Sequence, residues 1–139
     1  MWKQALKLKG TKDLIDEEII NLDDVILTKP VYNKVKNTIE KAIARNELVT
    51  TNLKGVGKTT AVIKLAKKYD LSVVTLHSEV EELSEKFNYG RIYSLQMITG
   101  NLDDYKNHKF IVDCGRNTEG VINALRNNGL NVISGVICN

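Results

Sequence analysis

The chain has 139 residues, a length that suits a single domain with a sizeable hydrophobic core. Hydrophobic residues make up 42% of it and charged residues 27%, as in ordinary soluble globular proteins, and no apolar run is long enough to span a membrane. The net charge of +3 is compatible with nucleic acid as a partner but does not indicate one, because the basic residues are spread along the chain.

The cysteines and the start of the chain predict a compartment. Cys114 and Cys138 make no disulfide framework and are interpreted as small core residues. Residues 1–10 are basic but lack the apolar run of a signal peptide. We therefore expect a cytoplasmic protein that is not associated with a membrane.

Residues 1–30 are first basic and then acidic. They are interpreted as an N-terminal arm of unclear structure, which precedes a domain at 31–139. Four lysines come first, and a run of acidic residues follows them. Four apolar residues have the spacing of one face of a short helix: Leu14, Ile15, Ile19 and Leu22. We expect a solvated arm packed on the domain, with a partner-binding arm as the alternative.

Hydrophobic periodicity after this arm predicts alternating helices and strands. Pro30 suits the first turn of a helix, Ser78 with Glu81 forms a capping-box pattern, and Gly129 suits a helix end. The expected elements are a helix at 31–45, a strand at 47–51, a helix at 58–69, a strand at 71–77, a helix at 78–87, a strand at 109–113, a helix at 118–129 and a strand at 130–138. The pattern over 91–108 is ambiguous, with a short helix favoured near 94–98. This order predicts an α/β fold, a three-layer sandwich around a mostly parallel sheet of four to five strands.

The stretch "NLKGVGKTT" at 52–60 lies between a predicted strand and a predicted helix, which is the context of a phosphate-binding loop. Gly55 and Gly57 let backbone N–H groups approach phosphate oxygens closely. Lys58 would reach the β- and γ-phosphates, and Thr59 would offer its hydroxyl to Mg²⁺. The residues expected to contact the nucleotide are Lys54, Gly55, Val56, Gly57, Lys58, Thr59 and Thr60.

Asn52 stands where the pattern G-x-x-x-x-G-K-[ST] has its first glycine. After glycine, Asn is among the residues that best tolerate a positive φ. We therefore expect the loop to turn at Asn52 and to remain able to bind phosphate.

A metal-bound nucleotide also needs a carboxylate at the end of a neighbouring strand. "KFIVDCG" supplies Asp113 directly after three apolar residues. Asp113 and Thr59 are therefore the predicted metal-side residues, and a turn-initiating role for Asp113 is the alternative.

With both motifs in place, the sequence resembles the P-loop NTPase superfamily over about residues 47–138. "NLKGVGKTT" corresponds to its Walker A motif and "FIVDCG" to its Walker B motif. The chain looks most like a minimal AAA+-type core, and "NLDDYKNHKFIVD" is similar to the run into Walker B of small helicase-loader ATPases. The resemblance implies a strand order of 1-4-3-2, which leaves Lys58 and Asp113 at the carboxyl edge of the sheet. AAA+ proteins continue with a fifth strand and a helical lid, so we expect a minimal core, a fragment or a subunit completed by a partner.

Hydrolysis requires a group that orients the attacking water. In the resembled branch a Glu often follows the Walker B Asp directly, and this chain has Cys114 there. Glu79, which follows the second predicted strand, is therefore the predicted catalytic carboxylate beside Lys58. Its alternative role is an acidic residue in a helix's first turn, and Glu119 is a weaker candidate for the base.

Three further polar residues each have a structural and a functional interpretation. Arg116 and Asn139 are candidates to contact a γ-phosphate, whereas a solvent-facing loop Arg and a frayed chain end are the simpler interpretations. His77 is expected to be an inert residue at a strand end.

Three functions fit these motifs. The leading hypothesis is an ATP-binding protein, a nucleoside-triphosphatase whose slow or partner-stimulated, Mg²⁺-dependent hydrolysis makes it a nucleotide switch. ATP is the default nucleotide because no N-K-x-D-type guanine signature follows the remaining strands. The alternatives are a nucleoside or nucleotide kinase, to which "LRNNGLNVISG" has a short likeness, and a degenerate, non-hydrolysing P-loop scaffold. The partner would be another protein or a second copy of the chain.

Overall fold

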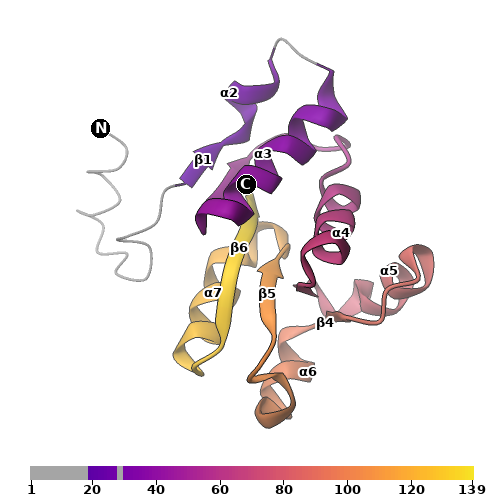
Figure 1. Ribbon diagram of the computed structural model, residues 1–139, viewed down its shortest axis with the longest axis vertical. Helices are drawn as coiled ribbons and strands as arrows, with labels where there is room; N and C mark the ends of the chain where they lie inside the picture. The colour runs from indigo at the N-terminus through magenta and orange to yellow at the C-terminus, as the bar shows by residue number, and fades with distance from the viewer. Residues whose placement is uncertain (1–18, 28–29) are drawn as a thin grey trace.

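The computed structural model describes residues 19–27 and 30–139, and these form a six-stranded, all-parallel sheet flanked by helices (Figure 1). The strands are β1 (Ile19–Asn21), β2 (Leu48–Thr51), β3 (Ser72–Val74), β4 (Ile92–Tyr93), β5 (Lys109–Val112) and β6 (Asn131–Cys138). The helices are α2 (Leu22–Ile26), α3 (Val31–Arg45), α4 (Lys58–Tyr69), α5 (Val80–Phe87), α6 (Leu95–Thr99) and α7 (Thr118–Asn127). The predicted α/β class with a parallel, three-layer arrangement is confirmed.

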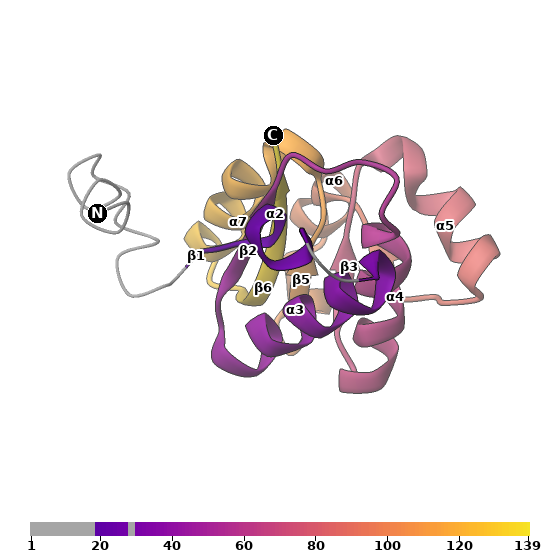
Figure 2. The same ribbon diagram turned by 90° about the horizontal axis from the view of Figure 1, so that it is seen from above.

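Side chains of the strands alternate between two hydrophobic clusters, one on each face of the sheet. Val49 and Ile111 belong to the cluster that includes α2, α3 and α4, whereas Leu48 and Phe110 belong to the cluster that includes α6 and α7. Figure 2 shows α3 and α4 on one side of the strands and α7 on the other. Both faces are covered, and for this reason the strands are continuous apolar runs in the sequence.

Strand β6 joins the two halves of the sheet. It pairs with β2 on one side and with β5 on the other. Gly135 of β6 lies where α7 packs directly on the sheet: a Cβ there would be 2.9 Å from Ile122 Cδ1 and 3.1 Å from the carbonyl oxygen of Val112. The C-terminal strand is therefore a central structural element.

The strand count, and with it the full strand order, differs from the prediction of four to five strands in the order 1-4-3-2, although the four predicted strands keep that relative order, β2-β6-β5-β3. The observed order among the described residues is β1-β2-β6-β5-β3-β4. The four predicted strands are the four inner ones, and β1 and β4 add one strand at each edge. These edge strands have three and two residues, which is too short for an alternating pattern to be visible in the sequence.

Residues 19–26 pack on the sheet and on α3. β1 pairs with β2, and Leu22 and Ile26 of α2 are buried in the cluster that includes α3 and α4. The predicted short helix is wrong at Ile19, which lies in β1. Leu14 and Ile15, with the rest of residues 1–18, fall outside the described residues.

The second predicted strand and the helix after it also differ in detail. β3 ends at Val74, and a 3₁₀ turn at His77–Glu79 follows it, closed by a bond from Glu79 N–H to the Leu76 carbonyl (2.9 Å). α5 then begins at Val80 without a side-chain cap, so the predicted capping box is wrong. This turn satisfies backbone groups that a side-chain cap would otherwise bind.

The contact at Gly135 gives a test of the packing between α7 and β6. Gly135→Ala should lower the free energy of unfolding by about 1–3 kcal/mol, because the added methyl group overpacks a site bounded by backbone. Gly120→Ala in α7 is the matched control: its Cβ meets nothing within 4 Å, and Ala should stabilise the helix by about 0.5–1 kcal/mol. Urea denaturation measures both changes, and equal effects would show that Gly135 is not a close-packed position.

Candidate functional site

The loop between β2 and α4 has the backbone expected of a phosphate-binding loop. Gly55 (φ 69°) and Gly57 (φ 80°) are both left-handed, a conformation that favours glycine. Gly57 is the N-cap of the 12-residue helix α4 and makes no side-chain cap bond. The first N–H groups of α4 therefore end at the loop, where an anion can accept from them.

Asn52 does not adopt the conformation expected of it. The non-glycine residues with positive φ in the described part of the chain are Asn46, Asp70 and Asn88. The tolerance of Asn for positive φ is therefore not used at Asn52. The backbone at this position does not require the glycine of the usual pattern.

Instead, a carboxylate from α2 holds the first residue of the loop. The two carboxylate oxygens of Asp23 accept from the backbone N–H of Asn52 at 3.1 and 3.0 Å, and one of them also accepts from the hydroxyl of Thr51. Thr51 Oγ1 in turn accepts from the N–H of Leu53 at 2.9 Å. Asp23 belongs to the acidic run that was expected to be solvated, and its contact with the loop was not predicted, since charge alone does not indicate which backbone a carboxylate meets.

A tyrosine from α3 packs against the other end of the loop. A Cβ on Gly57 would lie 2.8 Å from Cδ1 of Tyr32, so the ring closes directly over this glycine. Lys64 Nζ of α4 lies 5.7 Å from the centre of the same ring. α2 and α3, which precede β2 in the chain, therefore hold the loop at both of its ends.

Lys58 and Cys138 meet at the carboxyl edge of the sheet. Lys58 Nζ donates to the carbonyl oxygen of Leu53 at 2.7 Å and to Sγ of Cys138 at 3.2 Å. Cys138 is partly exposed, so its prediction as a core residue is wrong, because β6 ends beside the loop. The ammonium lies inside the turn of the loop, where a phosphate would compete for its protons.

Thr59 and Asp113, both predicted as metal-side residues, are in contact across the sheet edge. Thr59 Oγ1 donates to Oδ2 of Asp113 at 3.1 Å. The pKa of the Asp113 carboxyl is raised above its ordinary value, chiefly because the protein displaces water from it, and the Thr59 hydrogen bond and the Lys58 charge oppose that rise. Proximity to Glu79 contributes to the same increase in pKa.

Glu79 is oriented by a residue that the sequence did not single out. Thr75, buried at the end of β3, donates from its hydroxyl to Oε2 of Glu79 at 3.3 Å. Glu79 itself is exposed. Asp113 N–H donates to the carbonyl of Val74, so the two strand ends that carry these carboxylates are adjacent.

Cys114 is enclosed and chemically inert. It is 4% exposed, and burial raises the pKa of its thiol to about 12, with the Asp113 and Glu79 charges adding to the effect. Its backbone N–H meets Oγ1 of Thr118, which donates to the carbonyl of Val136. Cys114 is a small core residue, as predicted.

The remaining candidates are spread around this edge. Arg116 is exposed in a 3₁₀ turn, and Glu119 lies in the first turn of α7. Asn139 continues the strand pairing by donating from its N–H to the Thr51 carbonyl at 3.0 Å. The predicted loop residues Lys54, Val56 and Thr60 are at least partly accessible.

His77 is also at this edge and has a partner. Its Nδ1 lies 2.8 Å from Oγ of Ser94, which is fully buried and also caps α6 by accepting from the N–H of Met97. His77 therefore joins the turn after β3 to the start of α6, a structural role.

Comparison with known proteins identifies no relative: no protein-family model matches the chain, and no curated protein matches it. Within residues 19–27 and 30–139, no helix is long and apolar enough to cross a membrane. The same residues contain no group of three or more His, Cys, Asp or Glu side chains arranged to hold a metal ion.

The Asp23 contact gives a test of the loop's anchoring. Asp23→Asn should lower the free energy of unfolding by about 1–2 kcal/mol, because the carboxylate has two accepting oxygens for its two donors, the Asn52 N–H and the Thr51 hydroxyl, whereas an amide has one. Asp24→Asn is the matched control, since Asp24 lies in the same first helical turn but is exposed. Urea denaturation compares the two variants, and equal stability would contradict an anchoring role for Asp23.

Proposed function

We propose that the chain binds Mg-ATP at the loop between β2 and α4 and hydrolyses it slowly, acting as a nucleotide switch. The observation that carries this proposal is the contact between Thr59 and Asp113, 3.1 Å, directly beside a loop with two left-handed glycines and a lysine. An ammonium and a hydroxyl from the start of α4 and a carboxylate that follows β5 meet at one sheet edge. This combination suits a phosphate with its counter-ion.

The loop supplies the phosphate-binding groups. The N-terminal N–H groups of α4 would donate to phosphate oxygens, because Gly57 leaves them without a side-chain cap. Lys58 would exchange its bonds to Leu53 and Cys138 for bonds to phosphate, a stronger charge-assisted interaction. Asp23 and Tyr32 would hold the loop in this conformation from outside.

The residues present fit Mg²⁺ bound together with nucleotide phosphates. Mg²⁺ keeps several waters and takes one or two protein ligands beside the phosphates, and Thr59 and Asp113 supply one hydroxyl and one carboxylate. When bound, Mg²⁺ would neutralise charge on the phosphate oxygens. A bound cation would also favour the ionised form of the Asp113 carboxyl, which opposes the rise in its pKa that burial causes.

Glu79 is the group proposed to orient the attacking water. It is exposed, lies close enough to Asp113 to affect the pKa of that carboxyl, and receives a hydrogen bond from Thr75. Cys114 does not serve as a base, because its thiol is buried and its pKa is about 12. Since one exposed carboxylate held by one long hydrogen bond is loosely positioned, we expect slow turnover that a partner accelerates.

The first test is calorimetry with Mg-ATP on the wild-type chain and on Lys58→Ala. We expect the variant to bind about ten- to a hundredfold more weakly, because hydrogen bonds to charged groups are worth about 1.5–3 kcal/mol. Lys86→Ala on α5 is the control for the loss of one positive charge. An absence of Mg-ATP binding by the wild-type chain would overturn the proposal and leave a non-binding P-loop scaffold.

The second test separates hydrolysis from binding. Glu79→Gln should lower the rate of phosphate release by about a hundredfold, the usual contribution of a general base, while leaving Mg-ATP affinity unchanged. Glu82→Gln, an exposed residue of α5, is the matched control. Unchanged turnover in Glu79→Gln would remove the residue from the mechanism, and phosphate transfer to an added nucleoside would identify a kinase instead.

A further inference from the structure

The basic residues of the chain are concentrated on two helices. Apart from Lys58 in the loop, α3 and α4 together carry seven Lys and Arg residues against one acidic residue, Glu40. The basic members are Lys34, Lys36, Lys41 and Arg45 of α3 and Lys64, Lys67 and Lys68 of α4. The residues outside these two helices comprise 12 basic and 16 acidic side chains, so the excess positive charge of the chain comes from α3 and α4.

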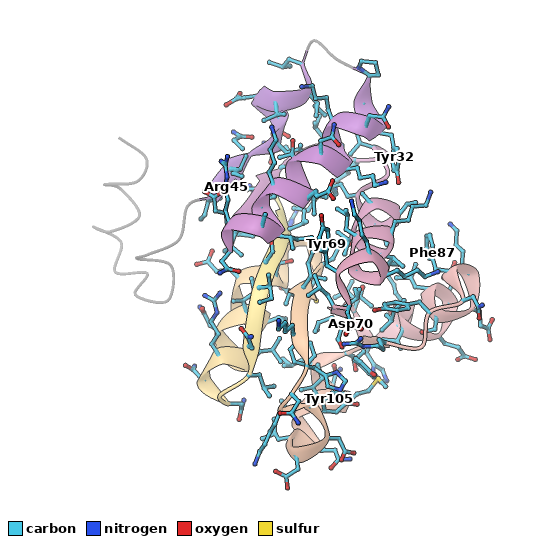
Figure 3. All side chains as sticks on the ribbon, in the orientation of Figure 1. Tyr32, Arg45, Tyr69, Asp70, Phe87 and Tyr105 are labelled. Atoms are coloured by element: carbon cyan, nitrogen blue, oxygen red, sulfur yellow. The ribbon has the colours of Figure 1, made fainter. Side chains whose placement is uncertain are left out.

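The two helices pack side by side on the same face of the sheet. Glu40 of α3 pairs with Lys68 of α4 at 2.6 Å and also accepts from the hydroxyl of Tyr69. Lys64 of α4 lies over the ring of Tyr32 of α3. Figure 3 looks onto this side of the molecule, with Arg45, Tyr69 and Tyr32 distributed across the two helices. The two helices therefore present a shared surface, which we call the α3–α4 face, whereas Lys67 of α4 bonds to the carbonyl of Phe87 in α5.

This face has a hollow and exposed aromatic rings between its charges. A cavity of about 360 Å³ lies along α3, and its polar lining consists of Lys34, Asn37, Thr38, Glu40 and Lys41 of α3 with Tyr69 of α4. Lys34 and Lys41 are two turns apart on the helix, so they lie on the same side of α3. The Tyr69 side chain is 41% exposed, which leaves an aromatic surface beside the ammonium groups.

The single acidic residue offsets one of the seven positive charges. Glu40 is already engaged by Lys68 and Tyr69, and the pKa of its carboxyl is lowered by these hydrogen bonds. Asp70, just after α4, is paired with Arg91. Asp24 of the neighbouring α2 is exposed, and Asp23 is bound to the loop. The α3–α4 face thus remains strongly positive.

We propose that the α3–α4 face binds the phosphate backbone of nucleic acid. A polyanion complements the charge, amide and tyrosine side chains between the lysines supply further phosphate and base contacts, and a hollow bordered by lysines admits a phosphodiester. An anionic membrane fits less well. Most apolar residues of α3, such as Val35 and Ile39, are buried against the sheet and are not available to enter lipid.

The α3–α4 face and the nucleotide site share structural elements. α4 begins at Lys58 and Thr59 and carries Lys64 further along, and Tyr32 of α3 covers Gly57. Nucleic acid on this face is therefore in a position to accelerate hydrolysis. This coupling rests on the proposed function, whereas binding to the face does not.

The test is fluorescence anisotropy with labelled single-stranded and double-stranded DNA over a range of salt concentrations. Wild-type protein should bind in low salt, and Lys34→Gln/Lys41→Gln should bind at least about tenfold more weakly, with a salt-dependence slope smaller by about one to two. The matched control is Lys106→Gln/Lys109→Gln, which removes the same charge from exposed positions at the start of β5 and just before it. This control should bind like the wild-type protein.

Two outcomes would overturn the proposal. These are an absence of DNA binding, and an equal loss in both double variants, which would mean that net charge alone attracts DNA. Binding to phosphatidylserine vesicles without binding to DNA would assign the face to lipid instead. Mg-ATP calorimetry on Lys34→Gln/Lys41→Gln keeps the two proposals distinguishable: the variant should retain the wild-type affinity for nucleotide while losing DNA.

Discussion

The insertion of β6 between β2 and β5 is the constraint on which the rest of the structure depends. β2 leads into the phosphate loop, and β5 leads into Asp113, but these strands do not pair with each other. Only the last strand of the chain joins them, and it brings Cys138 beside Lys58 and the backbone of Asn139 beside Thr51. Close packing at Gly135 fixes α7 against this strand. The proposed nucleotide site is therefore a product of long-range pairing, because each half of the sheet contains only part of it.

Electrostatics at this edge follow from burial and proximity. Asp113 lies where water is displaced, which disfavours its charge, while Lys58 and the Thr59 hydroxyl favour it. Glu79 lies close enough for its negative charge to raise the pKa of Asp113 further. Two carboxylates and an ammonium that lie close together would complement a ligand that carries both signs of charge, such as the metal-bound phosphate proposed here. Cys114, in contrast, lies in the core, where its thiol donates to the Val74 carbonyl and its backbone N–H donates to the Thr118 hydroxyl.

The segment that precedes β2 has two roles in this architecture. Asp23 and Tyr32 hold the loop from outside, and the exposed side of α3 carries part of the basic surface. α4 likewise begins at the proposed nucleotide site and carries exposed lysines on its outer side. The same two helices thus connect the loop with the surface proposed for nucleic acid. The net charge of the sequence does not indicate this surface, because residues 46–57 separate α3 from α4 along the chain.

The sequence by itself determined the α/β class, the inner strands, helices α3 and α4, and the residues Lys58, Thr59 and Asp113, because each rests on local periodicity or on a contiguous motif. Only the tertiary structure decided the contact between Thr59 and Asp113, the edge strands β1 and β4, and the anchoring by Asp23. It also decided that Asn52 needs no positive φ and that Thr75 orients Glu79. The physical reason is separation along the chain. Periodicity and motifs depend on residues a few positions apart, whereas hydrogen bonds such as that from Asn52 to Asp23 join residues that only the folded sheet brings together.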